Sequence, residues 1–142
     1  IFRTTDGKTV NFRGIENIRL YQEDDRILAI KADTGRLDLK QNVLTLTGVQ
    51  GEINGGRLHT VRLKVDLERK EIASTHPLSF AKEGLELQAN RMEGNFETEE
   101  YLFSGDLEVV QGKHRSRGQV FTYYAKEDRF ELTGNVEVEL EL

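Results

Sequence analysis

Residues 101–110 read Y-L-F-S-G-D-L-E-V-V, and the chain repeats this phrase with small changes. Residues 130–138 read F-E-L-T-G-N-V-E-V, and residues 43–49 read V-L-T-L-T-G-V. In each copy, a short run that alternates apolar and polar side chains meets a glycine. Alternation with a period of two is the pattern of a β-strand with one buried face. The phrase therefore predicts strands that are interrupted by glycine at a fixed point.

The glycines of the three copies, Gly48, Gly105 and Gly134, recur at a regular spacing. The last two lie 29 residues apart, and the first two lie 57 apart, or about twice that period. Each copy also follows a polar cluster typical of a turn, such as residues 126–129. A phrase that recurs with a period of about twenty to fifty residues indicates a repeat architecture.

The repeated glycine predicts a bend that carries each strand from one sheet to another. A glycine inside a strand has no side chain to pack and weakens the strand. Its recurrence at one register indicates a geometric role, because glycine permits a bulge or a sharp bend. On this interpretation, Tyr101 and Phe103 line one sheet while Leu107 and Val109 line a second, facing sheet.

The rest of the chain fits the same scheme, since no stretch has a helical period. Residues 57–65 alternate and place Val61, Leu63 and Val65 on one face. Pro77 stands where other copies have glycine. Because proline is confined to strand edges, strand starts and bulges, we expect this copy to bend or to lie at an edge. The sequence thus predicts an all-β protein of antiparallel strands in two facing sheets, without significant helix.

Length and composition suit one domain over residues 1–142, with 37% hydrophobic residues to form a core. The formal net charge of −5 argues against nucleic acid as a partner, because such affinity comes mainly from Lys and Arg at phosphates. Cysteine is absent, which excludes disulfides, thiolate metal sites and cysteine nucleophiles.

Nothing in the sequence indicates catalysis. His59, His76 and His114 are scattered without a metal-ligand spacing, and no serine-hydrolase, P-loop or dinucleotide fingerprint occurs. We expect no catalytic residues, no metal and no cofactor. The basic run at residues 113–117 has two interpretations: it binds lipid phosphates, or it is a solvated loop.

The repeated pattern resembles the OstA-like repeat of lipopolysaccharide-export proteins. It occurs as I-K-A-D at 30–33 with L-T-G-V at 46–49. It recurs as L-Q-A-N at 87–90 with F-S-G-D-L at 103–107, and finally as L-T-G-N-V at 132–136. Single motifs of this kind are short and weakly specific, whereas their repetition in register over nearly the whole chain is much more specific.

Two branches of that family are represented. Residues 14–20 and 25–33, and the passage I-A-S-T-H-P-L at 72–78, look like the LptC branch. The last two repeats look equally like the LptA branch, which is the second choice.

The resemblance implies a twisted, open β-jelly roll in the periplasm. It implies a non-enzymatic bridge component that binds lipopolysaccharide and passes it from the inner-membrane ABC transporter through an apolar groove. The implied partners are lipopolysaccharide, the permease side of that transporter, and the next periplasmic bridge protein, joined by edge-strand addition. LptC-like proteins are anchored in the inner membrane by an N-terminal helix. Because the chain begins at Ile1 without such a helix, we expect the anchor to be missing here.

The expected site is the apolar interior, which would shelter acyl chains. Its expected lining is Leu28, Ile30, Leu44, Leu46, Leu85, Leu87, Tyr101, Phe103, Leu107, Val109, Phe121, Tyr123, Phe130, Leu132 and Val136. The expected partner-binding edges are Thr9, Val10 and Phe12 near the N-terminus and Val136, Val138 and Leu140 near the C-terminus. Unpaired edges recruit other strands unless they are protected. The alternating glutamates of residues 137–141 also fit such protection by charge.

Two other functions stay open on the residues alone. One is a structural or adhesive β-repeat protein with a closed core and no lipid cargo, and the other is a small glycan-active enzyme. An interior that is open along one side would favour lipid transfer. A closely packed interior would favour the closed core.

Overall fold

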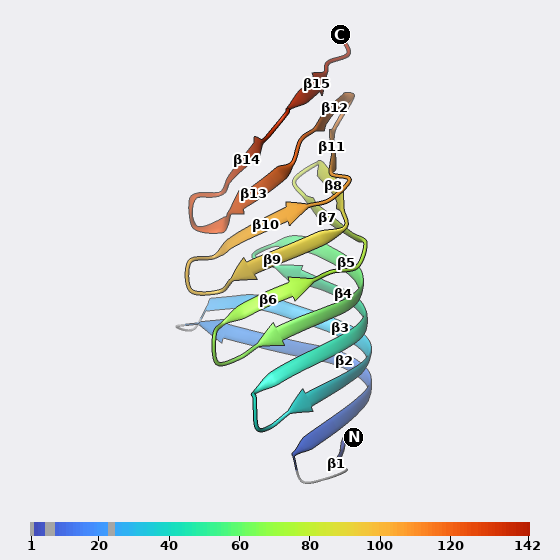
Figure 1. Cartoon of the computed structure of the whole chain (residues 1–142), viewed down its shortest axis with the longest axis vertical. Helices are drawn as coiled ribbons and strands as arrows, with labels where there is room; N and C mark the ends of the chain where they lie inside the picture. The colour runs from blue at the N-terminus through green and yellow to red at the C-terminus, as the bar shows by residue number, and fades with distance from the viewer. Residues whose placement is uncertain (1, 5–7, 23–24) are drawn as a thin grey trace.

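The computed structural model describes residues 2–4, 8–22 and 25–142, with only the backbone described at 2–4 and 22. The described chain forms a long, twisted roll whose strands run across its length, and the two termini lie at opposite ends (Figure 1). All neighbouring strands are antiparallel. The expected all-β fold is therefore confirmed.

A short first strand is followed by four long strands and then by shorter ones. The strands are β1 Phe2–Thr4, β2 Thr9–Gln22, β3 Asp25–Asp38, β4 Val43–Ile53, β5 Gly56–Asp66, β6 Glu71–Ser74, β7 Leu78–Lys82, β8 Leu85–Ala89, β9 Arg91–Asn95, β10 Glu100–Ser104, β11 Glu108–Gln111, β12 His114–Arg117, β13 Val120–Tyr124, β14 Arg129–Thr133 and β15 Glu137–Glu139. One 3₁₀ turn, Ala125–Glu127, joins β13 to β14.

The strands form one continuous sheet that folds into two facing walls. The order β14-β13-β10-β9-β6-β5-β7-β8-β11-β12-β15 passes from one wall to the other through β5. We define wall A as the whole strands β1, β6, β9, β10, β13 and β14 together with one half of each long strand. These halves are the N-terminal halves of β2 and β4 and the C-terminal halves of β3 and β5. Wall B comprises β15, β12, β11, β8, β7 and the other halves of β2–β5. The line along which the chain crosses between the walls is the corner.

The side-chain alternation changes phase where a strand crosses the corner. In β3, burial falls on every second residue up to Ala32 and resumes at Gly35, while Asp33 and Thr34 between them are both exposed. Two successive outward residues bend the strand and keep its apolar side chains facing inward on both walls. The long strands can therefore belong to both walls without a break.

The same phase change in β5 corrects one expectation from the sequence. Val61 does not lie on the face of Leu63 and Val65: its side chain points outward and is 59% exposed. Thr60 is buried before the corner and Leu63 after it. Uninterrupted alternation gives the wrong face for Val61 because the strand bends there.

The repeated glycines lie at the corner in a left-handed backbone conformation. Gly48, Gly105 and Gly134 have φ of +68°, +82° and +83°. A Cβ on Gly48 would lie 2.2 Å from the Asp33 carboxylate oxygen, and one on Gly105 would lie 3.0 Å from the Cβ of Asn90. The Asp or Asn at the preceding crossing thus packs against the next glycine, which explains why A-D occurs with T-G in one copy and A-N with S-G in another. The predicted sheet-switching role of the glycines is confirmed.

Pro77 lies at the same corner, in the gap between β6 and β7. Polar side chains support the backbone there: the Ser74 hydroxyl donates to the Arg62 carbonyl at 2.7 Å and lies 3.1 Å from the Thr60 hydroxyl. The expected bend in this copy is confirmed, with proline standing where the other copies have glycine.

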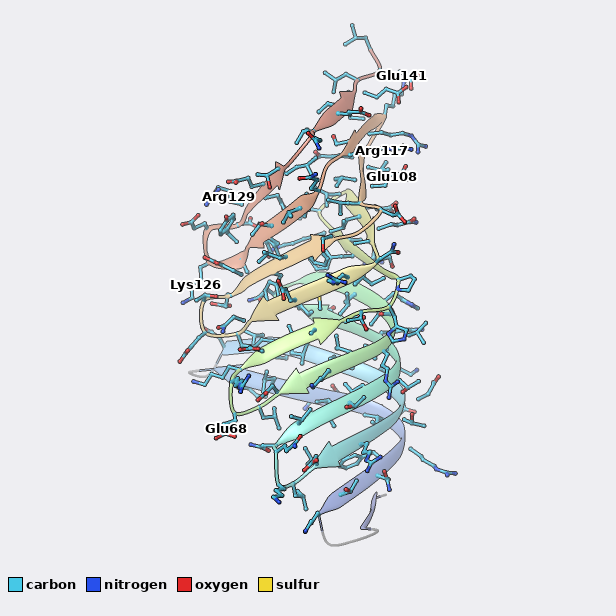
Figure 2. The ribbon with its side chains drawn as sticks, in the orientation of Figure 1. Glu68, Glu108, Arg117, Lys126, Arg129 and Glu141 are labelled. Atoms are coloured by element: carbon cyan, nitrogen blue, oxygen red, sulfur yellow. The ribbon has the colours of Figure 1, made fainter. Side chains whose placement is uncertain are left out.

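The interior between the walls is filled by apolar side chains, whereas charged side chains occupy the outer faces and turns. Glu68, Lys126 and Arg129 point away from the sheet at the turns of wall A (Figure 2). The largest fully buried side chains are Tyr101, Tyr123, Phe80, Phe103, Ile30, Leu46, Ile53, Leu58, Leu63, Ile72, Leu87 and Met92.

Candidate functional site

Twelve of the fifteen expected interior residues lie fully buried between the walls. They are Leu28, Ile30, Leu44, Leu46, Leu85, Leu87, Tyr101, Phe103, Leu107, Val109, Phe121 and Tyr123, each at most 9% exposed. They belong to a single apolar cluster. The structure therefore brings these side chains together from both walls, as a packed interior.

The remaining three mark the end of the roll where that interior becomes exposed. Phe130 and Leu132 are half-buried and pack against the cluster. Val136 is 45% exposed, and Val138 is 56% exposed. Val138 pairs with Ser116, which in turn pairs with the buried Val109, so Val138 continues the inward-facing row. The apolar interior thus emerges into solvent at the C-terminal end.

Aromatic rings connect the middle of the interior to this open end. The Phe80 and Phe103 ring centroids lie 5.1 Å apart, and those of Tyr101 and Tyr123 lie 6.0 Å apart. Tyr123 stacks on Phe130 with centroids 4.9 Å apart. Offset aromatic contacts in this range are favourable beyond the area they bury.

The hairpin turns of the two walls lie on the side opposite the corner; we name this side the seam. Wall A hairpins close with four-residue turns at 39–42, 67–70 and 96–99. Wall B hairpins close more tightly, as at Asn54-Gly55, where φ is 48° and 85°. Two successive positive φ values are those of a type I′ turn, which favours Asn-Gly.

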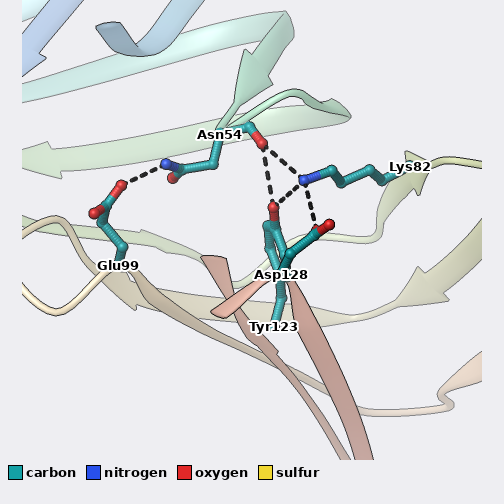
Figure 3. Close-up of polar contacts among 5 residues, drawn as sticks. All are labelled: Asn54, Lys82, Glu99, Tyr123 and Asp128. Carbon is teal, nitrogen blue, oxygen red and sulfur yellow. Dashed lines mark hydrogen bonds and ion pairs between the residues drawn. The ribbon is translucent and has the colours of Figure 1, made fainter. Parts of the chain in front are cut away.

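A polar cluster crosses the seam at Asn54 (Figure 3). The Asn54 side-chain amide donates to the Glu99 carboxylate at 2.5 Å, and its amide oxygen accepts from the Tyr101 hydroxyl at 2.6 Å. The Asn54 carbonyl accepts from the Tyr123 hydroxyl at 3.2 Å. The turn of wall B is thereby tied to β10 and β13 of wall A.

Lys82, at the end of β7, completes this cluster. Its ammonium donates to the Asn54 carbonyl and the Asp128 carboxylate, both at 3.2 Å, and to the Tyr123 hydroxyl. Burial lowers the pKa of Lys82, while the hydrogen bonds to Tyr123 and Asp128 raise it, and the net shift is upward. Lys82 is therefore cationic at neutral pH. We name Asn54, Lys82, Glu99, Tyr101, Tyr123 and Asp128 the clasp.

The edge expected at residues 9–12 is not the edge of wall A. β1 pairs with this segment through Thr4–Val10 and Phe2–Phe12, and β3 pairs with its other side. Thr9 and Val10 are 5% and 8% exposed. Thr9, Val10 and Phe12 therefore lie one strand inside the edge, because the short N-terminal strand folds back over them.

The expected C-terminal edge lies where the sequence placed it. β14 and β15 are the two ends of the strand order, so each wall finishes there. Val136, Val138 and Leu140 are all exposed. No other described strand pairs with the outer sides of β14 and β15, so this edge combines available backbone groups with an exposed apolar row.

The basic run at residues 113–117 faces acidic residues on the neighbouring strands. Arg115 forms an ion pair with Glu108 at 2.8 Å and lies opposite Glu139, while Arg117 lies opposite Glu137. This pairing depends on the strand register, so no local pattern in the sequence indicates it. The run is thus partly neutralised by its neighbours.

Metal-binding clusters and membrane-spanning helices are both absent from the described residues, 2–4, 8–22 and 25–142. No group of three or more His, Asp or Glu side chains there is arranged to hold a metal ion. No helix in that part of the chain has the length and apolarity to cross a membrane.

Comparison with known proteins agrees with this architecture. A sequence model of the family described as "Lipopolysaccharide-assembly, LptC-related" matches residues 3–110, well over half of the chain. The chain belongs to this family. Membership supports a role in the lipopolysaccharide transport bridge of the periplasm.

A solved structure has the same fold. It is described as LptH, the LptA homologous periplasmic component of the lipopolysaccharide transport device of Pseudomonas aeruginosa. The TM-score is 0.67 at 12% identity, with 81% of this chain and 95% of that chain covered. At this identity the likeness shows the β-jelly-roll fold alone. The family match to LptC-related proteins and the fold of an LptA homologue together agree with the expected resemblance, LptC-like first and LptA-like second. No curated protein matches the chain.

Proposed function

We propose that this LptC-related chain is a non-enzymatic bridge component that binds lipopolysaccharide acyl chains between its two walls. The observation that carries the proposal is an apolar interior that runs the length of the roll and emerges uncovered at the C-terminal end. Acyl chains gain about 0.8 kcal/mol for each CH₂ that they bury. A trough of this kind therefore binds lipid without a charged or catalytic site.

In the isolated domain, without its partners, lipid would first contact the open C-terminal end and then the space between the walls. Phe130 and Leu132 are half-buried, so an acyl chain can reach them without displacing the core. The middle of the interior is packed, since Leu46 and Tyr123 are 0% exposed. We propose that the walls part as acyl chains replace the contacts that these side chains make with each other.

We propose a direction of transfer from the N-terminal end to the C-terminal end. We propose that the C-terminal edge of β14 and β15 receives the next bridge protein by strand addition. Unpaired strands with an apolar row are suited to such pairing. The N-terminal end, with β1 outermost, would face the inner-membrane ABC transporter, and an N-terminal anchor helix would hold the domain at that membrane.

The packed interior also favours a second candidate, a structural β-repeat protein with a closed core. Its twelve fully buried side chains would then only stabilise the fold. The two candidates differ in whether the inward face at the open end contacts lipid.

The fluorescence of one introduced tryptophan distinguishes the two candidate functions, because the chain has no tryptophan of its own. Leu132→Trp places the reporter on the inward face of β14, and Glu131→Trp places it on the outward face of the same strand as a matched control. With lipopolysaccharide, we expect a blue shift and increased emission from Leu132→Trp and little change from Glu131→Trp. No change at Leu132→Trp in a folded protein would favour the closed core.

A further inference from the structure

We propose that the clasp is a lateral gate: it holds the seam closed over the aromatic interior, and its release admits acyl chains sideways between the walls. This inference rests on the proposed function. It adds the place at which the roll opens and the residues that control the opening.

The seam is the side on which the walls are able to part. At the corner, β2 to β5 run unbroken from one wall to the other, so that side is held by covalent chain and by backbone ladders. Across the seam, by contrast, the described residues form no backbone ladder. Opening there separates side chains only.

The clasp carries the polar contacts across the seam. Between residues 25 and 142, the side-chain hydrogen bonds that cross the seam all involve Asn54 or Lys82. Their partners are 41 to 69 residues away along the chain. Two residues of wall B therefore hold β10, β13 and the turns that precede β10 and β14 in wall A.

Water can replace the hydrogen-bond partners of the clasp residues. The Lys82 side chain is 13% exposed and that of Asp128 is 58% exposed, so solvent is already close to the contacts. Net hydrogen-bond strength is small where water can replace the partner. Separation leaves polar groups that water can satisfy, together with apolar rings that an acyl chain can cover.

The clasp is coupled directly to the interior beneath it. Tyr101 and Tyr123 are 1% and 0% exposed, yet their hydroxyls reach Asn54 at the seam. The Lys82 ammonium lies 4.9 Å from the Tyr123 ring centroid, and the Phe80 ring centroid lies 5.7 Å from that of Tyr123. Releasing the hydroxyls therefore frees the rings that fill the middle of the roll.

The gate is tested by the rate at which lipid reaches the interior. A p-benzoylphenylalanine in place of Phe103 reports arrival behind the clasp, and the same residue in place of Leu132 reports arrival at the open end. Asn54→Gly with Lys82→Met opens the clasp, since glycine keeps the positive φ of the turn. Lys70→Met is the matched control, because Lys70 pairs with Glu97 within wall A only.

We expect the opened clasp to speed adduct formation with lipopolysaccharide at position 103 by about tenfold, the equivalent of one to two net hydrogen bonds. The rate at position 132 and the rates in Lys70→Met should stay unchanged. Equal rates at position 103 with and without the clasp would overturn the gate.

A locked form gives an independent test if the opened variant folds poorly. The chain has no cysteine, so Asn54→Cys with Glu99→Cys can be joined by a short bis(methanethiosulfonate), which forms two reducible disulfides with loss of methanesulfinate. Locking should abolish adducts at position 103 and leave those at 132, and reduction should restore them. Persistent adducts at 103 in the locked form would overturn the gate. Absence of adducts at both positions in the unlocked chain would instead refute the lipid-binding function.

Discussion

Replacing Gly105 by alanine tests whether the repeated glycine is required by the corner. Gly105 has φ of +82°, and an added Cβ would meet the Cβ of Asn90 at 3.0 Å. Gly84, in the β7–β8 turn, has φ of +83° but nothing within 4 Å of an added Cβ. The two substitutions therefore share the backbone strain and differ in the contact at the corner.

The expected magnitudes follow from these two terms. A left-handed backbone destabilises an alanine by about 1–2 kcal/mol in the folded state. The lower conformational entropy of the unfolded chain with alanine offsets about 0.4–1 kcal/mol of this loss. Gly84→Ala should thus destabilise by about 0–1.6 kcal/mol. Gly105→Ala should cost about 1–3 kcal/mol more, the range for overpacking at a site that cannot relax freely.

Urea unfolding followed by far-UV circular dichroism measures both values, provided that the slope m is unchanged. Equal losses in the two variants would refute the reasoning, because they would show that Asn90 does not restrict position 105. A larger loss for Gly84→Ala would refute it as well.

Two further predictions concern the core and the clasp. Leu46→Ala, at a side chain that is 0% exposed, should lower the unfolding free energy by about 2–5 kcal/mol, whereas Val61→Ala, at 59% exposure, should change it by about 0.5 kcal/mol or less in the same urea assay. A similar loss at both positions would contradict the corner phase change. Burial, together with the charges of Glu99 and Tyr123, raises the pKa of Tyr101. Its neutral form therefore contributes stability that is complete below about pH 10 and is lost as the pH rises further. The unfolding free energy of the unaltered chain should fall by about 1.4 kcal/mol more than that of Tyr101→Phe between pH 9 and pH 11, and parallel pH profiles would contradict this.

The local pattern was enough to predict the repeat and its sheet switch. Tyr101 and Phe103 lie on one wall and Leu107 and Val109 on the other, as alternation interrupted by glycine indicates. This worked because strand period and glycine conformation are local properties. Both properties act within a few residues and can therefore be recognised from the sequence.

What the sequence did not predict depends on contacts between distant residues. Asn54-Gly55 is a recognisable turn signal, but nothing local shows that its carbonyl meets Tyr123, 69 residues later. The covering of residues 9–12 by β1 and the pairing of Arg115 with Glu108 likewise depend on register. The clasp therefore could be found only once the two walls were folded together.

The central claim is that acyl chains lie between the walls, and photocrosslinking at adjacent residues of one strand tests it most directly. The photoreactive residue is placed in turn at Phe103 and Leu102 of β10 and at Leu132 and Glu131 of β14, with lipopolysaccharide present. We predict adducts at the inward positions 103 and 132, with 132 reacting faster, and few or none at 102 and 131. Equal adducts on the two faces, or none at any inward position in a folded protein, would contradict the account.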